Sequence, residues 1–178
     1  MLTLGASAAV MASALYTDLR KGVIPNALTY PAVFLGVALA YAAGGTDQVI
    51  SSVLGCGLGF GVLFLGFMFG GIGGGDVKLA GALGALTGLG VTVLGLLYMG
   101  LLSGAMALAI MIWKGKLLAS LKNMWRFMYT SLIPFLETES LDAENSEKFP
   151  LGVAIVGGWA WALVEQYRGV SSILGIDL

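Results

Sequence analysis

The sequence predicts an all-α integral membrane protein with six transmembrane helices. Of its 178 residues, 58% are hydrophobic and only 11% are charged, whereas a soluble domain carries roughly 25% charged residues. Long apolar runs alternate with short polar segments, and the basic residues gather in only a few of those segments. The length suits one domain, so we expect a single membrane-embedded domain over residues 1–178.

The first span is predicted over residues 1–16. This run is apolar and short, and basic residues follow it rather than precede it. A cleaved signal peptide has the opposite order, so we interpret the run as a first span whose N-terminus lies outside. Residues 18–26 (DLRKGVIPN) form a polar turn in which Pro25 and Asn26 can begin the next helix. A second span over 27–43 ends at a Gly-Gly pair.

The third span is predicted over 49–69, where many glycines would let neighbouring helices approach closely. The next apolar run, 79–113, is too long for one crossing of about 20 residues. Its natural break is the sequence TGLG at 87–90. The break gives a short fourth span and a fifth span over 91–113. A short span is tolerated where protein covers its backbone.

A long polar segment, 114–148, separates the fifth span from the sixth. Its first half has apolar residues at helical spacing, with Lys122 and Arg126 on the other side. This pattern predicts an amphipathic helix in the cytoplasmic interface; the alternative is a helix packed on the spans. The second half is acidic and typical of a solvated loop. A sixth span over 149–164 and a short tail, 165–178, complete the chain.

Six spans place both termini outside. The cytoplasmic segments are then 17–26, 70–78 and 114–148, which hold all but one of the 9 Lys and Arg residues. The exception is Arg168. This distribution is a strong positive-inside signal. Without the break in the longest apolar run, the basic residues that follow it would lie outside, so the charges support the break. We expect a multi-pass protein of the cell membrane.

The residue inventory excludes several kinds of site. The chain has no histidine, and its one cysteine, Cys56, lies within an apolar run. A disulfide framework, a Cys/His zinc site and a Ser–His or Cys–His nucleophile are therefore excluded. We expect no metal, no cofactor and no nucleic acid partner.

Two aspartates are distinctive because the predicted topology places both at the cytoplasmic edge. Asp18 lies at the cytoplasmic end of the first span, and Asp76 follows the glycine-rich stretch 70–75. Two carboxylates about 4 Å apart repel by on the order of 4 kcal/mol at an effective dielectric near 20. They would share one proton and so supply one acid and one base. Such a pair can activate water against a peptide carbonyl, and the glycines would let an extended substrate backbone approach.

The alternative for the glycine-rich stretch is purely structural. The glycines would form a flexible turn, and Asp76 would be the N-cap of the next helix.

Three segments resemble the prepilin peptidases. Asp18, Arg20 and Ile24-Pro25-Asn26 are similar to their D-x-R-x-x-x-IPN signature. Gly73-Gly74-Gly75-Asp76-Val77-Lys78-Leu79 is similar to their GxGD-VKL motif, and Phe149-Pro150-Leu151-Gly152 resembles the start of their last span. The resemblance covers essentially the whole chain. It implies a GxGD-type intramembrane aspartic peptidase that removes the leader from type IV prepilins or pseudopilins, with Asp18 and Asp76 as the catalytic pair.

The resemblance also suggests a branch of that family. The chain lacks the cysteine-containing cytoplasmic insert of the larger bifunctional members, and its small size resembles the branch that serves tight-adherence (Flp-type) pili. Gly73, Gly75, Pro25 and Asn26 are expected to support the motifs by shaping the backbone. Lys78 could tune the aspartates, but we interpret it as an interfacial, positive-inside lysine. The pattern does not identify substrate-binding residues.

Four other functions fit parts of the sequence. An archaeal-type preflagellin or prepilin peptidase is one alternative. A non-catalytic membrane protein of pilus assembly is another, because an inactive peptidase with intact motifs would look identical. A presenilin-like protease ranks low because Tyr16 and Asp18 are not an adjacent Tyr-Asp pair. A small transporter would need polar groups near the bilayer midplane, whereas both aspartates are at one edge.

Overall fold

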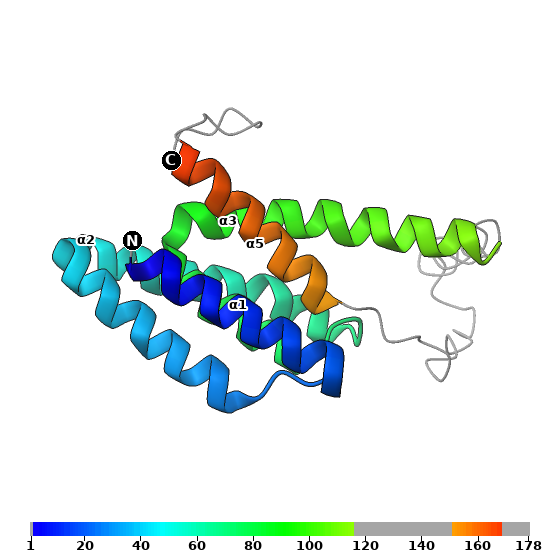
Figure 1. The fold of residues 1–178 in the computed structure, drawn as a ribbon, viewed down its shortest axis with the longest axis horizontal. Coiled ribbons are helices and arrows are strands. Elements are labelled where there is room, and N and C mark those ends of the chain that lie inside the picture. Colours follow the sequence, from blue (N-terminus) through cyan, green and yellow to red (C-terminus); the bar gives the residue numbers. More distant parts are fainter. Residues whose placement is uncertain (1, 116–150, 169–178) are drawn as a thin grey trace, which may run out of the picture. The chain divides into compact units, whose positions relative to one another are not determined.

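The computed structural model describes residues 2–115 and 151–168. The described residues form α-helices, which confirms the predicted all-α class (Figure 1). The helices are α1 (Leu2–Lys21), α2 (Asn26–Met68), α3 (Gly74–Trp113) and α5 (Leu151–Arg168). The predicted interfacial helix and acidic loop within 116–148 lie outside the described residues.

The chain divides into two compact units. One contains Met1–Leu102 and Pro150–Leu178, and the other contains Ser103–Phe149. The first unit includes α1, α2, α5 and the part of α3 up to Leu102. The single domain over 1–178 stays a prediction.

Glycines break α2 and α3 where the sequence predicts loops between spans. In α2, Gly45 has φ 66° and ψ −143°, and the helix folds back on itself (Figure 1). In α3, Gly88 has φ 79° and ψ 176°. Glycine reaches these positive φ angles without steric strain. The Ser51 hydroxyl accepts a hydrogen bond of 3.0 Å from the Leu89 amide, which partners a backbone group beside the break.

The helices are those of a membrane protein. In the described residues, α1, α2 and α3 are long and apolar enough to cross a membrane. The two halves of α2, the two halves of α3, α1 and α5 correspond to the six predicted spans. Six crossings, and the side on which each end lies, stay predictions.

The first half of α3 is the most buried of the described helix segments, and Asp76 lies in its first turn. All residues from Leu79 to Leu86 are buried. Both halves of α2 contact this segment through glycines that leave no room for a side chain. A Cβ built at Gly36 would lie 2.6 Å from the carbonyl carbon of Ala85. A Cβ built at Gly59 would lie 2.5 Å from the carbonyl oxygen of Ala80. Small residues allow this approach of two backbones. The close packing therefore holds the helix that carries Asp76.

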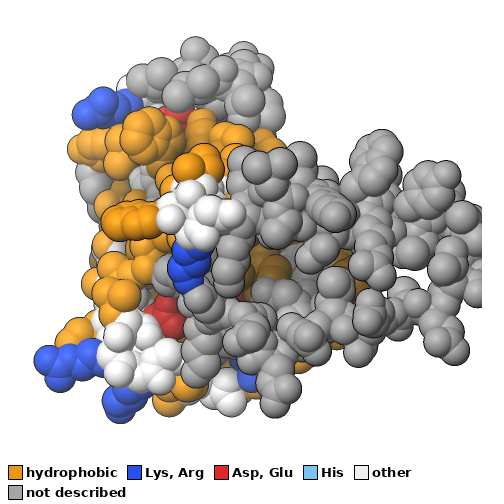
Figure 2. All heavy atoms as spheres, turned by 90° about the vertical axis from the view of Figure 1, so that its right-hand side faces the viewer, with side chains coloured by type: hydrophobic (Ala, Val, Ile, Leu, Met, Phe, Trp, Pro, Cys, Tyr) orange, Lys and Arg blue, Asp and Glu red, His pale blue; other side chains and the backbone are white. Residues whose placement is uncertain are grey.

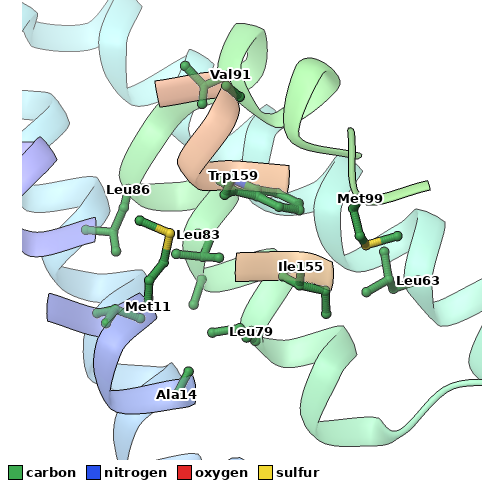
Figure 3. Close-up of a cluster of buried hydrophobic side chains, with 14 of the residues drawn as sticks. Met11, Ala14, Leu63, Leu79, Leu83, Leu86, Val91, Met99, Ile155 and Trp159 are labelled. Carbon is green, nitrogen blue, oxygen red and sulfur yellow. The ribbon is translucent and has the colours of Figure 1, made fainter. Parts of the chain in front are cut away.

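The last helix packs on α3 in part through one aromatic ring. Trp159 is fully buried, and it lies so close to Gly95 that a Cβ there would meet Cδ2 of the indole at 2.7 Å. Figure 3 shows Leu79, Leu83 and Ile155 in the same cluster. Through Ile155 and Trp159 this cluster packs the first half of α5 against α3.

α5 extends beyond the predicted sixth span, which itself stays a prediction. The sequence suggested a tail from residue 165, but α5 continues to Arg168 and buries Glu165. Glu165 follows the buried positions 155, 159 and 162 at helical spacing. The hydroxyl of Tyr98 donates a hydrogen bond of 2.7 Å to Glu165 Oε2, which gives the buried carboxyl a partner.

Candidate active site

Asp18 lies in the last turn of α1, where a glycine ends the helix. The Gly22 amide donates to the Asp18 carbonyl oxygen at 2.8 Å, and Gly22 has φ 61°. This arrangement is the left-handed C-terminal cap that favours glycine. Buried Ile24 anchors the following link, and Pro25 (φ −72°, ψ 140°) is the residue before α2. The prediction that Pro25 and Asn26 begin the second helix is confirmed.

Asp76 lies in the first turn of α3, after the glycine turn. The amides of Asp76 and Val77 donate to the Gly73 carbonyl oxygen at 3.1 and 3.3 Å, so the helix starts from Gly73. The interpretation of Asp76 as the N-cap is therefore wrong, because the helix begins two residues earlier. An acidic side chain in the first turn is favourable for the helix dipole.

The motif glycines make room around Asp76. A Cβ at Gly73 would lie 3.0 Å from Asp76 Oδ2, and a Cβ at Gly75 would lie 3.2 Å from the Ile24 Cβ. Larger residues would therefore push on the carboxylate or on the link between α1 and α2. Both glycines belong to the predicted motif, and these contacts give a physical reason for each.

Asp18 and Asp76 line the same cavity, of about 380 Å³. The cavity walls come from the end of α1, the link to α2 and the start of α3. The lining residues are Asp18, Gly22, Val23, Ile24, Asn26, Gly73, Gly74, Gly75, Asp76 and Lys78. On the face shown in Figure 2, blue basic side chains lie close to red acidic ones. All the predicted site residues except Pro25 therefore line this cavity. Pro25 does not line it, but its chain neighbours Ile24 and Asn26 do.

The two carboxyl groups interact electrostatically. Asp76 precedes the apolar run that starts at Leu79, so it lies outside the predicted membrane span. Burial raises the pKa of Asp76, the negative charge of Asp18 raises it further, and a backbone hydrogen bond from Gly73 lowers it, with a net pKa of about 6. An ordinary aspartate has a pKa near 3.9. Asp76 therefore keeps a proton at weakly acidic pH, beside a second carboxyl group that can act as a base.

Lys78 bridges the starts of α2 and α3. Its Nζ donates to Asn26 Oδ1 at 2.9 Å and lies 5.9 Å from the centroid of the Tyr30 ring. Burial, Asp18 and Gly73 are the causes of the Asp76 pKa shift, and the contacts of Lys78 are with Asn26 and Tyr30. The lysine ties together two walls of the cavity. Arg20, the other basic residue of the motifs, lies over the Tyr16 ring at 4.9 Å.

Some residues at the site were not singled out from the sequence. Gly22, Val23 and Gly74 line the cavity, and Gly152 of α5 contacts Asp18. The short spacing between Asp18 and Asn26 could have indicated the first two, since the link between them must border Asp18. Gly152 belongs to the segment that resembles the start of the last span, but nothing local in the sequence pairs it with Asp18.

A larger cavity, of about 470 Å³, lies elsewhere in the first unit. It borders the break in α3, with Ser52, Thr87 and Gly88 among its lining residues. It contains none of the predicted site residues, so size alone does not identify the active site. In the described residues, no three side chains of His, Cys, Asp or Glu gather as a metal site requires.

Comparison with known proteins gives one match. The family model of the type IV leader peptidase family matches residues 6–112. The matched residues include both aspartates and stop before α5. No individual curated protein and no solved structure matches the chain.

Proposed function

The chain belongs to the type IV leader peptidase family, and from this premise we propose that it is an aspartic endopeptidase that cleaves the leader of type IV, Flp-like prepilins or pseudopilins. The proposed site is the cavity lined by Asp18 and Asp76. The predicted topology puts that cavity at the cytoplasmic face of the membrane.

One observation carries the proposal: two carboxyl groups from different helices line one cavity, and the charge of one raises the pKa of the other. A pair that shares a proton holds an acid and a base together. The raised pKa favours Asp76 as the acid, which leaves Asp18 as the base. Neither role needs a metal or a cofactor.

Hydrolysis then follows in two steps. Asp18 takes a proton from water while the water oxygen bonds to the scissile carbonyl carbon, and Asp76 gives its proton to the carbonyl oxygen. In the second step the C–N bond breaks as the leaving nitrogen receives the proton from Asp18, and a hydroxyl of the tetrahedral intermediate returns a proton to Asp76. At the end Asp18 is again ionised and Asp76 is again protonated.

The walls of the cavity suit an extended peptide. Gly73, Gly74 and Gly75 border the cavity on one side, and the link with Val23 and Ile24 borders it on the other. Glycines let a substrate backbone approach closely. The basic residues Arg20, Lys21 and Lys78 support placing this end of the helices in the cytoplasm.

The proposal predicts a defined product. Purified protein should cut a synthetic precursor, with a basic leader, a glycine at the cleavage position and a glutamate a few residues downstream, once after that glycine. The new N-terminus should be unmethylated, and inside-out vesicles should cleave the precursor when sealed right-side-out vesicles do not. Mass spectrometry of the product checks each point. An intact precursor would contradict the proposal, and a methylated product would contradict the monofunctional assignment.

A further inference from the structure

The backbone of α5 abuts the carboxylate of Asp18 at one residue. Gly152 is buried in the first turn of α5. A Cβ built there would collide with Asp18 Oδ2, and it would lie 3.0 Å from Cγ and 3.5 Å from Cβ of the same aspartate. The three nearest atoms all belong to Asp18. Glycine is therefore the residue that leaves the Asp18 carboxylate in its present position.

The other glycines of α5 have different neighbours. A Cβ at Gly157 would meet only Leu102 Cδ1, at 3.0 Å, which is the flexible end of a side chain. A Cβ at Gly158 would lie 2.5 Å from the Met99 amide nitrogen, which belongs to the backbone of α3. Of the three, only Gly152 faces a carboxylate. The reason for glycine at position 152 is thus distinct from helix packing.

A similar arrangement is present at the second aspartate. A Cβ at Gly73 would lie 3.0 Å from Asp76 Oδ2. Each carboxylate is therefore bordered by one glycine, but the two glycines come from different parts of the chain. Gly73 lies within the residues that match the family, 6–112, and Gly152 lies beyond them. The part of the chain that matches the family therefore does not include the glycine that contacts Asp18.

We propose that Gly152 is a positioning residue that sets the location of the Asp18 carboxylate, so that the start of α5 completes the active site. The inference rests on the proposed function, because it gives Asp18 a part in the reaction. An alanine methyl group at position 152 would force the aspartate side chain to rotate away. A misplacement of about 1 Å at a reacting group costs on the order of 100-fold in rate.

The test compares Gly152→Ala with Gly157→Ala in full-length purified protein, with the synthetic precursor as substrate. Gly152→Ala should lower kcat about 100-fold with little change in KM, because the substrate still binds while the base is displaced. The pH profile of cleavage should also shift, since the charge of Asp18 acts on Asp76. Gly157→Ala should retain the kcat and the pH profile of the wild type.

Two further variants separate the possible outcomes. Gly158→Ala should lower the thermal unfolding midpoint without moving the pH profile, which is the signature of a packing defect. Gly152→Ala with an unchanged pH profile would overturn the inference, whatever its rate. If Asp18→Asn is inactive and Gly152→Ala behaves as wild type, only the role of Gly152 is wrong. If Asp18→Asn cleaves normally, the proposed function itself is wrong.

Discussion

Asp18→Asn and Asp76→Asn should each reduce the rate of cleavage by about 10⁴-fold or more. Losses of this size are found at groups that act as a catalytic unit. Asparagine keeps the size of the side chain and a hydrogen-bonding group, but it can neither accept the proton of water nor hold a proton for the partner. Cleavage of the synthetic precursor, measured by mass spectrometry, checks the loss. Expression and the thermal unfolding midpoint should change little, because both side chains are only partly buried.

The double variant and a distant aspartate provide the controls. Since the two groups act together, Asp18→Asn combined with Asp76→Asn should be little worse than either single variant. Asp47 is exposed beside the break in α2, so Asp47→Asn should cleave as the wild type does. Near-normal cleavage by Asp18→Asn or Asp76→Asn, with host peptidase excluded, would rule out the two-aspartate mechanism.

A large loss of stability is expected from a substitution at the contact between α2 and α3, which holds the helix that carries Asp76. A Cβ at Gly55 would lie 2.5 Å from the Gly84 carbonyl oxygen and 2.8 Å from the Gly88 carbonyl carbon. These are backbone atoms, which cannot rotate away as a side chain can. Gly55→Leu should therefore cost about 3 kcal/mol or more, the upper range for overpacking. It should also abolish cleavage by displacing the helix that begins beside Asp76.

The matched control is two residues away on the same helix. A Cβ at Gly57 has no neighbour within 4 Å, so Gly57→Leu should be tolerated and should gain slightly from the better helix propensity of leucine. Thermal unfolding and size-exclusion chromatography in detergent compare the two variants. Equal stability of Gly55→Leu and Gly57→Leu would show that the backbones do not meet at Gly55.

The helices and their breaks were predictable because their signals are local. Apolar runs have a length that a bilayer crossing requires, and the breaks fall at Gly44-Gly45 and Gly88, where glycine adopts conformations that other residues avoid. The end of α5 was missed for the opposite reason. Glu165 was placed in the tail, and its partner Tyr98 is 67 residues away in the sequence, so no local pattern indicates that contact.

The site was predictable to the extent that motifs are local. The stretch from Asp18 to Asn26 and the stretch from Gly73 to Lys78 each supply several cavity residues. The bond from Lys78 to Asn26, and the contact of Gly152 with Asp18, depend on how separate helices pack. Local spacing carries no information about such contacts, so Lys78 was interpreted only as an interfacial charge.

The pH dependence of kcat/KM for the wild type tests the shared proton most directly, because this quantity reports the free enzyme's acid and base. The profile should be bell-shaped, with apparent pKa values that belong to the pair. Activity should fall at low pH as the base becomes protonated, and it should fall again as pH rises through about 6, where Asp76 loses its proton. A rate that stays constant or continues to rise between pH 6 and pH 8, about two units above that pKa, would contradict catalysis by Asp18 and Asp76 as one acid and one base.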